Sequence, residues 1–240
     1  MGAFSTSPDD LATASEVARL LASAESRDAA GRTAPSASSD LRRATRLLSR
    51  LLAAQGVHRD GRRFMKQRAL SPEAAARLDT AVEAFLVHPL HYNCVPACCD
   101  ASAIRFSQIC TAAHAIHFIG IRRPKLLLRF SPRHVQSWLV PSSTRIAPAA
   151  AAAFAQSPEG TTQHWRPLSD ALLVHSRWQV RDFLLRAIAR ASWPSPPRAL
   201  VDAVKRANRG GDPRILREVW QQRALRSLGA VAPAVRPRLL

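Results

Sequence analysis

The chain is a succession of short amphipathic segments that end at glycine or proline. Between residues 41 and 52, apolar side chains recur three and four positions apart, the spacing of one face of an α-helix: Leu41, Ala44, Leu47, Leu48, Leu51 and Leu52. Alternation of apolar and polar residues with period two is almost absent, and Ala and Leu dominate. The pattern predicts an all-α protein with an N-terminal helix near residues 9–25.

Predicted helix ends recur along the chain. We place them at Gly56, His88, Gly120, His175 and Gly210, with Pro89, Pro124 and Pro213 following three of them. The intervals are 32, 32, 55 and 35 residues, and the long one contains a Pro/Ala/Ser-rich stretch at 141–163. If that stretch is a disordered or extended insertion of about twenty residues, the spacing returns to roughly 32–35, typical of two-helix repeats.

These intervals predict stacked helical hairpins, an α-solenoid-like array, interrupted by the insertion. An irregular helical bundle with loops of ordinary spacing is the alternative. A helix near residues 106–119 is apolar on more than one side, as expected in the inner layer of an array. The predicted segments are an N-terminal helix and Ser/Ala-rich linker at 1–39, helical hairpins at 40–140, the Pro/Ala-rich insertion at 141–163, helical hairpins at 164–228 and an extended tail at 229–240.

The stretch "IRFSQICTAAHAIHFIGIRRPKLLLRF" at 104–130 resembles the repeat units of organellar octotricopeptide and heptatricopeptide proteins, relatives of the repeats found beside RAP domains. In both, an Ala-rich helix ends in a glycine turn, and a charged or proline step leads to a Leu-rich helix. The resemblance implies an RNA-associated protein of mitochondria or another organelle, with RNA processing, assembly or a mitochondrial ribosome as its setting. The chain end shows no RAP domain.

The charge of the chain favours a polyanionic partner. It carries 35 Lys and Arg against 17 Asp and Glu, a net charge of +18, and 32 of the basic residues are arginines. Residues 101–240 hold 22 basic and 6 acidic side chains. Arginine's planar fork suits phosphate oxygens and stacking on bases, which favours nucleic acid, although a GC-rich genome also enriches Arg and Ala.

The predicted turns supply the candidate RNA-binding residues. In a stacked array, equivalent turns fall along one edge, where basic side chains contact successive phosphates without reading sequence. The candidates are Arg59, Arg62, Arg63, Lys66, Arg122, Arg123, Lys125, Arg129, Arg177, Arg181, Arg206, Arg209 and Arg214. The alternative for any one of them is a structural role at a helix C-terminus, where a cation interacts favourably with backbone carbonyls.

Tryptophan and cysteine suggest two further kinds of site. The tryptophans of the basic half, Trp138, Trp165, Trp178, Trp193 and Trp220, are candidates for stacking on bases or for packing. Cys94, Cys98, Cys110 and His114 have the spacing of a zinc site, and buried apolar thiols are the alternative.

Neither a phosphate-binding glycine loop nor a hydrolase or metalloprotease motif is present, so we predict no enzyme and no cofactor.

No segment is long and apolar enough to span a membrane, and the start "MGAFST" fits the short myristoylation pattern. The sequence thus predicts a non-catalytic RNA-associated protein, most simply a structural component of a mitochondrial ribosome or of organellar RNA machinery, with ribosomal RNA and neighbouring proteins as partners. A helical scaffold that binds an acidic protein is the alternative.

Overall fold

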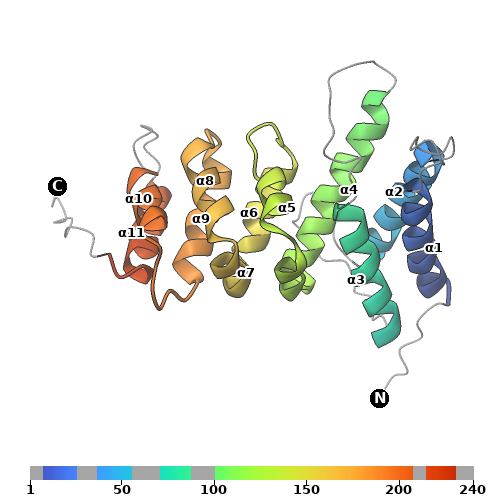
Figure 1. The fold of residues 1–240 in the computed structure, drawn as a ribbon, viewed down its shortest axis with the longest axis horizontal. Helices are drawn as coiled ribbons and strands as arrows, with labels where there is room; N and C mark the ends of the chain where they lie inside the picture. Colours follow the sequence, from blue (N-terminus) through green and yellow to red (C-terminus); the bar gives the residue numbers. More distant parts are fainter. Residues whose placement is uncertain (1–7, 26–36, 56–70, 88–100, 208–214, 231–240) are drawn as a thin grey trace. The chain divides into compact units, whose positions relative to one another are not determined.

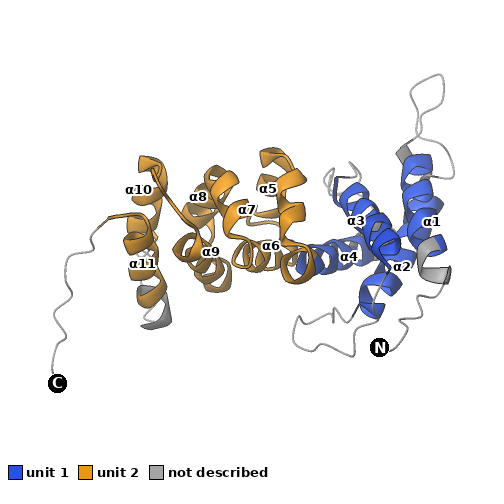
Figure 2. Cartoon of the chain, turned by 90° about the horizontal axis from the view of Figure 1, so that it is seen from below, with its two compact units in different colours: residues 1–118 blue, residues 119–240 orange. Residues whose placement is uncertain are grey.

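A computed structural model describes residues 8–25, 37–55, 71–87, 101–207 and 215–230. All regular secondary structure in these ranges is helical, which confirms the all-α prediction. The chain divides into two compact units, residues 1–118 and 119–240 (Figure 2).

Unit 1 contains α1 (Pro8–Glu25), α2 (Ala37–Ala54), α3 (Pro72–Val87) and most of α4 (Ala101–Arg122). Helix α1 packs against both α2 and α3. It buries Val17, Leu20, Leu21 and Ala24, which repeat at helical spacing, and thereby forms the apolar face that the other two helices cover. The predicted N-terminal helix is confirmed as α1. Every residue of α4 from Thr111 to Ile116 is buried, so this part of the helix is covered on all sides, in agreement with its apolar pattern on more than one side.

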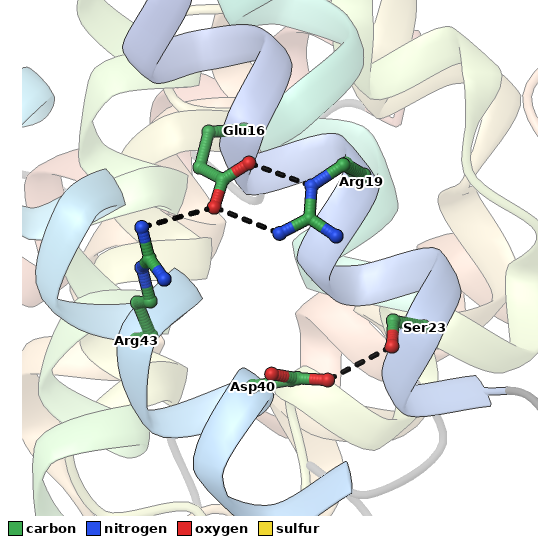
Figure 3. Close-up of polar contacts among 5 residues, drawn as sticks. All are labelled: Glu16, Arg19, Ser23, Asp40 and Arg43. Carbon is green, nitrogen blue, oxygen red and sulfur yellow. Dashed lines mark hydrogen bonds and ion pairs between the residues drawn. The ribbon is translucent and has the colours of Figure 1, made fainter. Parts of the chain in front are cut away.

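Polar contacts join side chains of α1 to side chains of α2 (Figure 3). Glu16 accepts two hydrogen bonds from Arg19, at 2.7 and 2.9 Å, and lies 3.2 Å from Arg43 of α2. Ser23 donates to Asp40 at 2.8 Å. The Arg19 hydrogen bond is the main reason that the pKa of Glu16 lies below its usual value.

Unit 2 is a series of short helices, together with the last turn of α4. They are the 3₁₀ helix η2 (Pro124–Arg129), α5 (Pro132–Trp138), α6 (Ile146–Phe154), α7 (Pro158–Gln163), α8 (Trp165–Val174), α9 (Trp178–Arg190), α10 (Arg198–Arg206) and α11 (Ile215–Ser227) (Figure 1). Serine–proline pairs begin α3, α5 and α7: the serine side chain accepts a hydrogen bond from a backbone N–H of the first turn, and proline occupies the first helical position.

The helices of unit 2 form two series of neighbours. Helix α8 contacts both α5 and α10, and α9 contacts both α6 and α11. Each helix of the first series is followed in the chain by one of the second, so that the pairs are α5–α6, α8–α9 and α10–α11. Helices α5, α8 and α10 begin at Pro132, Trp165 and Arg198, which are 33 residues apart.

The same buried triplet recurs in the first helix of each pair, at positions i, i+3 and i+4. It is Val135, Trp138 and the C-cap residue Leu139 in α5, Leu168, Ala171 and Leu172 in α8, and Leu200, Ala203 and Val204 in α10. Each of these side chains is at most 3% exposed. Since i, i+3 and i+4 lie on one face of a helix, each first helix turns an equivalent apolar face inward.

The prediction that residues 141–163 form a disordered or extended insertion is wrong. Most of that stretch forms α6 and α7, and the alanines of α6 are largely buried between Ile146 and Phe154. Alanine has the highest helix propensity, and the one proline inside α6, Pro148, lies in its first turn, where it is tolerated. Helix α6 is therefore the second helix of a pair, and the long interval of 55 residues contains helices in place of an insertion.

Side chains of unit 2 repeatedly bond to a backbone carbonyl about one pair upstream. His164 Nε2 lies 3.0 Å from the Leu127 oxygen, His175 Nε2 lies 2.6 Å from that of Leu139, and Arg190 donates to Ala155 at 2.8 Å. Ser157, Gln163 and Ser227 do the same toward Pro124, Leu128 and Ile188. These bonds join residues 33 to 39 positions apart, and they satisfy carbonyl groups at helix ends.

Two of the predicted helix ends are correct and one is wrong. Helix α3 ends at Val87 and α8 at Val174, each beside its predicted stop. Gly120, in contrast, is not a C-terminal cap, because α4 continues through it to Arg122. The predicted stops at Gly56 and Gly210 and the predicted tail from residue 231 onward lie outside the described residues.

Candidate nucleic-acid interface

Six of the predicted RNA-binding residues lie outside the residues that the structure describes. They are Arg59, Arg62, Arg63, Lys66, Arg209 and Arg214. The other seven are in unit 2 or at the end of α4, which is the basic half of the chain.

Four predicted residues surround η2. Arg122 is the last residue of α4, and Arg123 is the residue before η2. Lys125 and Arg129 lie in the first and last turns of η2, and both are exposed, whereas Leu126 and Leu127 between them are buried. The basic side chains near η2 are thus divided between two half-buried and two exposed positions.

The remaining three do not form one surface of free guanidinium groups. Arg177 donates to the Thr144 carbonyl, and Arg206 donates to the Asp202 carbonyl at 3.3 Å. Arg181 is half-buried in the first turn of α9. Arg206 lies in the last turn of α10, the setting of the structural alternative, and its contact is long and exposed. Arg177 precedes α9 and bonds to a carbonyl that precedes α6, so it is not at a helix C-terminus.

A row of arginines that the sequence prediction missed lies at the starts of the first helices. Arg133, Arg166 and Arg198 each stand two positions before the first member of the buried triplet in α5, α8 and α10. All three are exposed. We call them the arginine row. The signal was present as the recurring pattern Arg-x-[Val/Leu]-x-[Ser/Asp]-[Trp/Ala]-[Leu/Val] at 133–139, 166–172 and 198–204.

Helix stabilisation does not explain the arginine row. A helix N-terminus carries partial positive charge, so a cation there is unfavourable, whereas an arginine at a C-terminus is stabilising. Within the described part of the chain, no acidic side chain forms an ion pair with Arg133, Arg166 or Arg198. Helix α8 contacts both α5 and α10, and helices in contact are typically about 8–10 Å apart, so the row lies on three successive neighbouring helices.

The charge around the row is strongly unbalanced. Residues 119–240 contain 21 Lys and Arg and 6 Asp and Glu. Such an excess raises the local potential and attracts polyanions, and each added cation increases self-repulsion in the absence of an anion. Unit 2 thus combines a regular row of exposed arginines with a positive electrostatic potential that attracts phosphate groups.

The tryptophans differ in their surroundings. Trp138 is fully buried and meets the Phe130 ring edge-on at 4.8 Å, so base stacking on it is ruled out. Trp193 is half-buried and donates to the Ile188 carbonyl at 2.9 Å. Trp165 is half-buried beneath Arg166, whose guanidinium carbon lies 5.4 Å from the ring centroid. Trp178 is 39% exposed at the start of α9, which leaves it as the ring most open to a base.

Trp220 in α11 is surrounded by arginines. The guanidinium carbons of Arg186, Arg190 and Arg223 lie 5.1, 6.0 and 4.8 Å from its ring centroid. Arg186 also forms an ion pair with Asp182 at 2.8 Å. We call these five residues the Trp220 cluster; none of the three arginines was among the predicted site residues.

The described residues contain no group of three or more His, Cys, Asp or Glu side chains placed to hold a metal. Cys110 and His114 of the zinc hypothesis lie in α4, and Cys94 and Cys98 lie outside the described ranges. None of the described helices is long and apolar enough to span a membrane.

No protein-family model matches the chain, and comparison with curated proteins and with solved structures gives no match either. The resemblance to organellar repeat proteins therefore stays a prediction.

Proposed function

We propose that the protein is a non-catalytic RNA-associated protein that binds phosphate groups through unit 2. The observation that carries the proposal is the arginine row, in which one exposed arginine recurs at an equivalent position in three successive helix pairs. A recurring cation suits a polymer with recurring charge. Binding of this type is electrostatic and gives affinity with little sequence selectivity.

The organellar and ribosomal parts of the proposal rest on the family resemblance alone. Under this proposal the chain is a component of a mitochondrial ribosome or of organellar RNA processing and assembly machinery, with ribosomal RNA and neighbouring proteins as partners. Purification of the tagged protein from its native cell, with and without ribonuclease treatment, tests this part. A large ribonuclease-sensitive particle supports it, and a small ribonuclease-insensitive set of proteins contradicts it.

Direct RNA binding is tested with the full-length protein and a labelled single-stranded RNA in a fluorescence anisotropy titration. Substitution of Arg133, Arg166 and Arg198 by Gln removes three charges, and we expect the affinity at about 100 mM salt to fall tenfold or more. The matched control replaces Arg42, Arg46 and Arg50 by Gln. These three arginines are exposed on α2, so the control removes the same number of charges. Equal decreases in both variants would show that net charge, not the row, determines binding.

A specific observation also favours the scaffold alternative. Leu173 and Val174 at the end of α8 and Trp178 at the start of α9 are 44%, 60% and 39% exposed, although all three are large and apolar. All three flank the same three-residue turn, and exposed apolar side chains that lie together mark protein contacts. Arg177 in that turn is exposed, and its positive charge, which the neutral Thr144 carbonyl does not cancel, would suit an acidic partner.

The two functions respond differently to substitution. If the protein is mainly a scaffold, replacing Leu173 and Val174 by Ser removes its protein partners in the purification and leaves RNA binding unchanged. If RNA binding is primary, the arginine-row variant loses the particle and the apolar variant keeps it.

A further inference from the structure

The Trp220 cluster concentrates positive charge more than packing requires. Its three guanidinium carbons lie within 4.8 to 6.0 Å of one ring centroid, so no two of them are more than about 11 Å apart, the sum of the two largest distances. At about 0.1 M salt the screening length is about 10 Å, so these charges repel one another. One cation over the ring would suffice to join α9 to α11.

The described groups around the cluster neutralise it only in part. Asp182 is 6% exposed and pairs with Arg186. Arg190 donates one N–H to the neutral Ala155 carbonyl, which fixes its position without cancelling its charge. Arg190 and Arg223 are exposed. Among the described side chains of the cluster, three guanidinium groups and one carboxylate leave two positive charges in excess.

The aromatic ring orients these charges for an anion. A guanidinium stacked on a ring face can still donate hydrogen bonds in its own plane, and such donors match phosphate oxygens. Arg186 uses part of its donors on Asp182, and Arg190 uses one on Ala155. Arg186 lies near two rings, 5.6 Å from Phe183 and 5.1 Å from Trp220, and it is held by Asp182 as well. Its position is therefore fixed before any ligand arrives, which lowers the entropic cost of binding.

We propose that the Trp220 cluster is a binding site for a phosphate monoester. A monoester carries a charge of about −1.5 to −2 at pH 7, which matches the excess of two among the described side chains. An internal phosphodiester of RNA carries one negative charge and leaves one of these cations uncompensated. The group is either the terminal phosphate of an RNA strand or a free mononucleotide. The RNA form of this proposal rests on the proposed function; the mononucleotide form does not.

The test compares two RNAs of identical sequence that carry a 5′-phosphate or a 5′-hydroxyl, each with a 3′ fluorophore, by anisotropy against the full-length protein. We expect the phosphorylated strand to bind about tenfold more tightly, the effect of about one charge-assisted hydrogen bond. A second arm titrates uridine 5′-monophosphate and uridine by calorimetry. Binding of the monophosphate, combined with equal binding of the two RNAs, assigns the site to a free nucleotide.

The variants isolate the cluster from the rest of the basic surface. Arg190→Gln with Arg223→Gln removes two cluster charges and keeps the Arg186–Asp182 pair. Lys205→Gln with Arg226→Gln removes two exposed charges of the same unit outside the cluster. We expect the first pair to abolish the preference for the monoester and the second to retain it. Because Arg190 also bonds to Ala155, Arg223→Gln alone serves as a milder variant, and circular dichroism checks that each variant folds.

Two results would overturn the proposal: equal binding of both RNAs combined with no binding of the monophosphate, or a preference that persists in the cluster variants. If neither RNA binds, the proposed RNA function fails, yet the calorimetric arm still decides the monoester site.

Discussion

Gly120 of α4 lies directly against Ala153 of α6. A Cβ atom on Gly120 would stand 2.5 Å from the Ala153 Cα and 2.8 Å from its Cβ, closer than real Cβ atoms approach. The absence of a side chain at 120 and the small side chain at 153 thus allow two helix backbones to meet. This contact explains why a glycine occupies the last turn of α4, where it would otherwise weaken the helix.

Gly120→Ala is expected to destabilise unit 2 although alanine is the better helix former. Forcing a Cβ into this contact should cost about 1–3 kcal/mol, which outweighs the gain of about 1 kcal/mol in helix propensity. Denaturant unfolding followed by circular dichroism measures the difference in the free energy of unfolding. Because the nearest atom is the Ala153 backbone Cα, adding Ala153→Gly should restore stability only in part. A single variant as stable as the original protein would show that the helices are not in contact.

In unit 1, the apolar face of α1 should determine stability more than its ion pairs. Leu20 is 1% exposed, and Leu20→Ala is expected to lower the free energy of unfolding by about 2–5 kcal/mol. Glu16 forms exposed ion pairs with Arg19 and Arg43, and such pairs are weak and screened by salt. Glu16→Gln should therefore leave the melting temperature nearly unchanged, and any difference should vanish in about 1 M salt. A Glu16→Gln effect as large as that of Leu20→Ala contradicts this view.

Stability should fall below neutral pH because of buried histidine. His164 is fully buried, and its Nε2 donates to the Leu127 carbonyl. Burial lowers the pKa of His164 below its ordinary value of 6.5, and that of His117 is lowered by burial and by nearby His114. Below about pH 6.5 the unfolded chain takes up protons that the folded chain does not, so the free energy of unfolding decreases as the pH falls toward the folded pKa. Each histidine contributes at most about 1.4 kcal/mol per pH unit.

Thermal melts between pH 5 and pH 7.5 measure this slope. His164→Gln should be less stable at pH 7.5 and should also show a flatter pH dependence. Gln163→Ala is the matched control, because Gln163 donates to the adjacent Leu128 carbonyl and does not titrate. Gln163→Ala should change the stability by the same amount at pH 5 and at pH 7.5. A His164→Gln slope equal to that of the original protein would show that His164 is not the group responsible.

The sequence predicted the helices well because helical periodicity is a local property. The face of α1 and the end of α3 before Pro89 follow from neighbouring residues alone. Helix α6 was missed because proline and a run of alanines suggested low complexity, although Ser157–Pro158 after it is a helix-start signal of the same kind as Ser71–Pro72. Burial of α6 against α9 is a tertiary property that composition does not reveal.

The candidate site was harder to predict, because charge alone does not say which arginines are occupied. Arg177 lies in a predicted turn, and only the fold shows that it donates to Thr144. Arg166 became visible as part of a row once α5 and α8 were found to begin 33 residues apart. The Trp220 cluster joins α11 to arginines thirty or more positions earlier in the chain, and its members follow no spacing that marks them in the sequence.

The salt dependence of RNA binding should report the number of phosphates that the arginine row contacts. For single strands, the slope of the logarithm of the binding constant against the logarithm of salt concentration is about −0.7 per neutralised phosphate. If Arg133, Arg166 and Arg198 each bind one phosphate, replacing all three by Gln should make the slope less negative by about 2, since each phosphate accounts for about 0.7. Replacement by Lys should keep the slope, because it keeps the charges, yet weaken binding at every salt concentration, because lysine lacks the planar fork. An unchanged slope in the Gln variant would mean that these arginines bind no phosphate, however much the affinity falls, and would return the RNA-binding proposal to other parts of the basic surface.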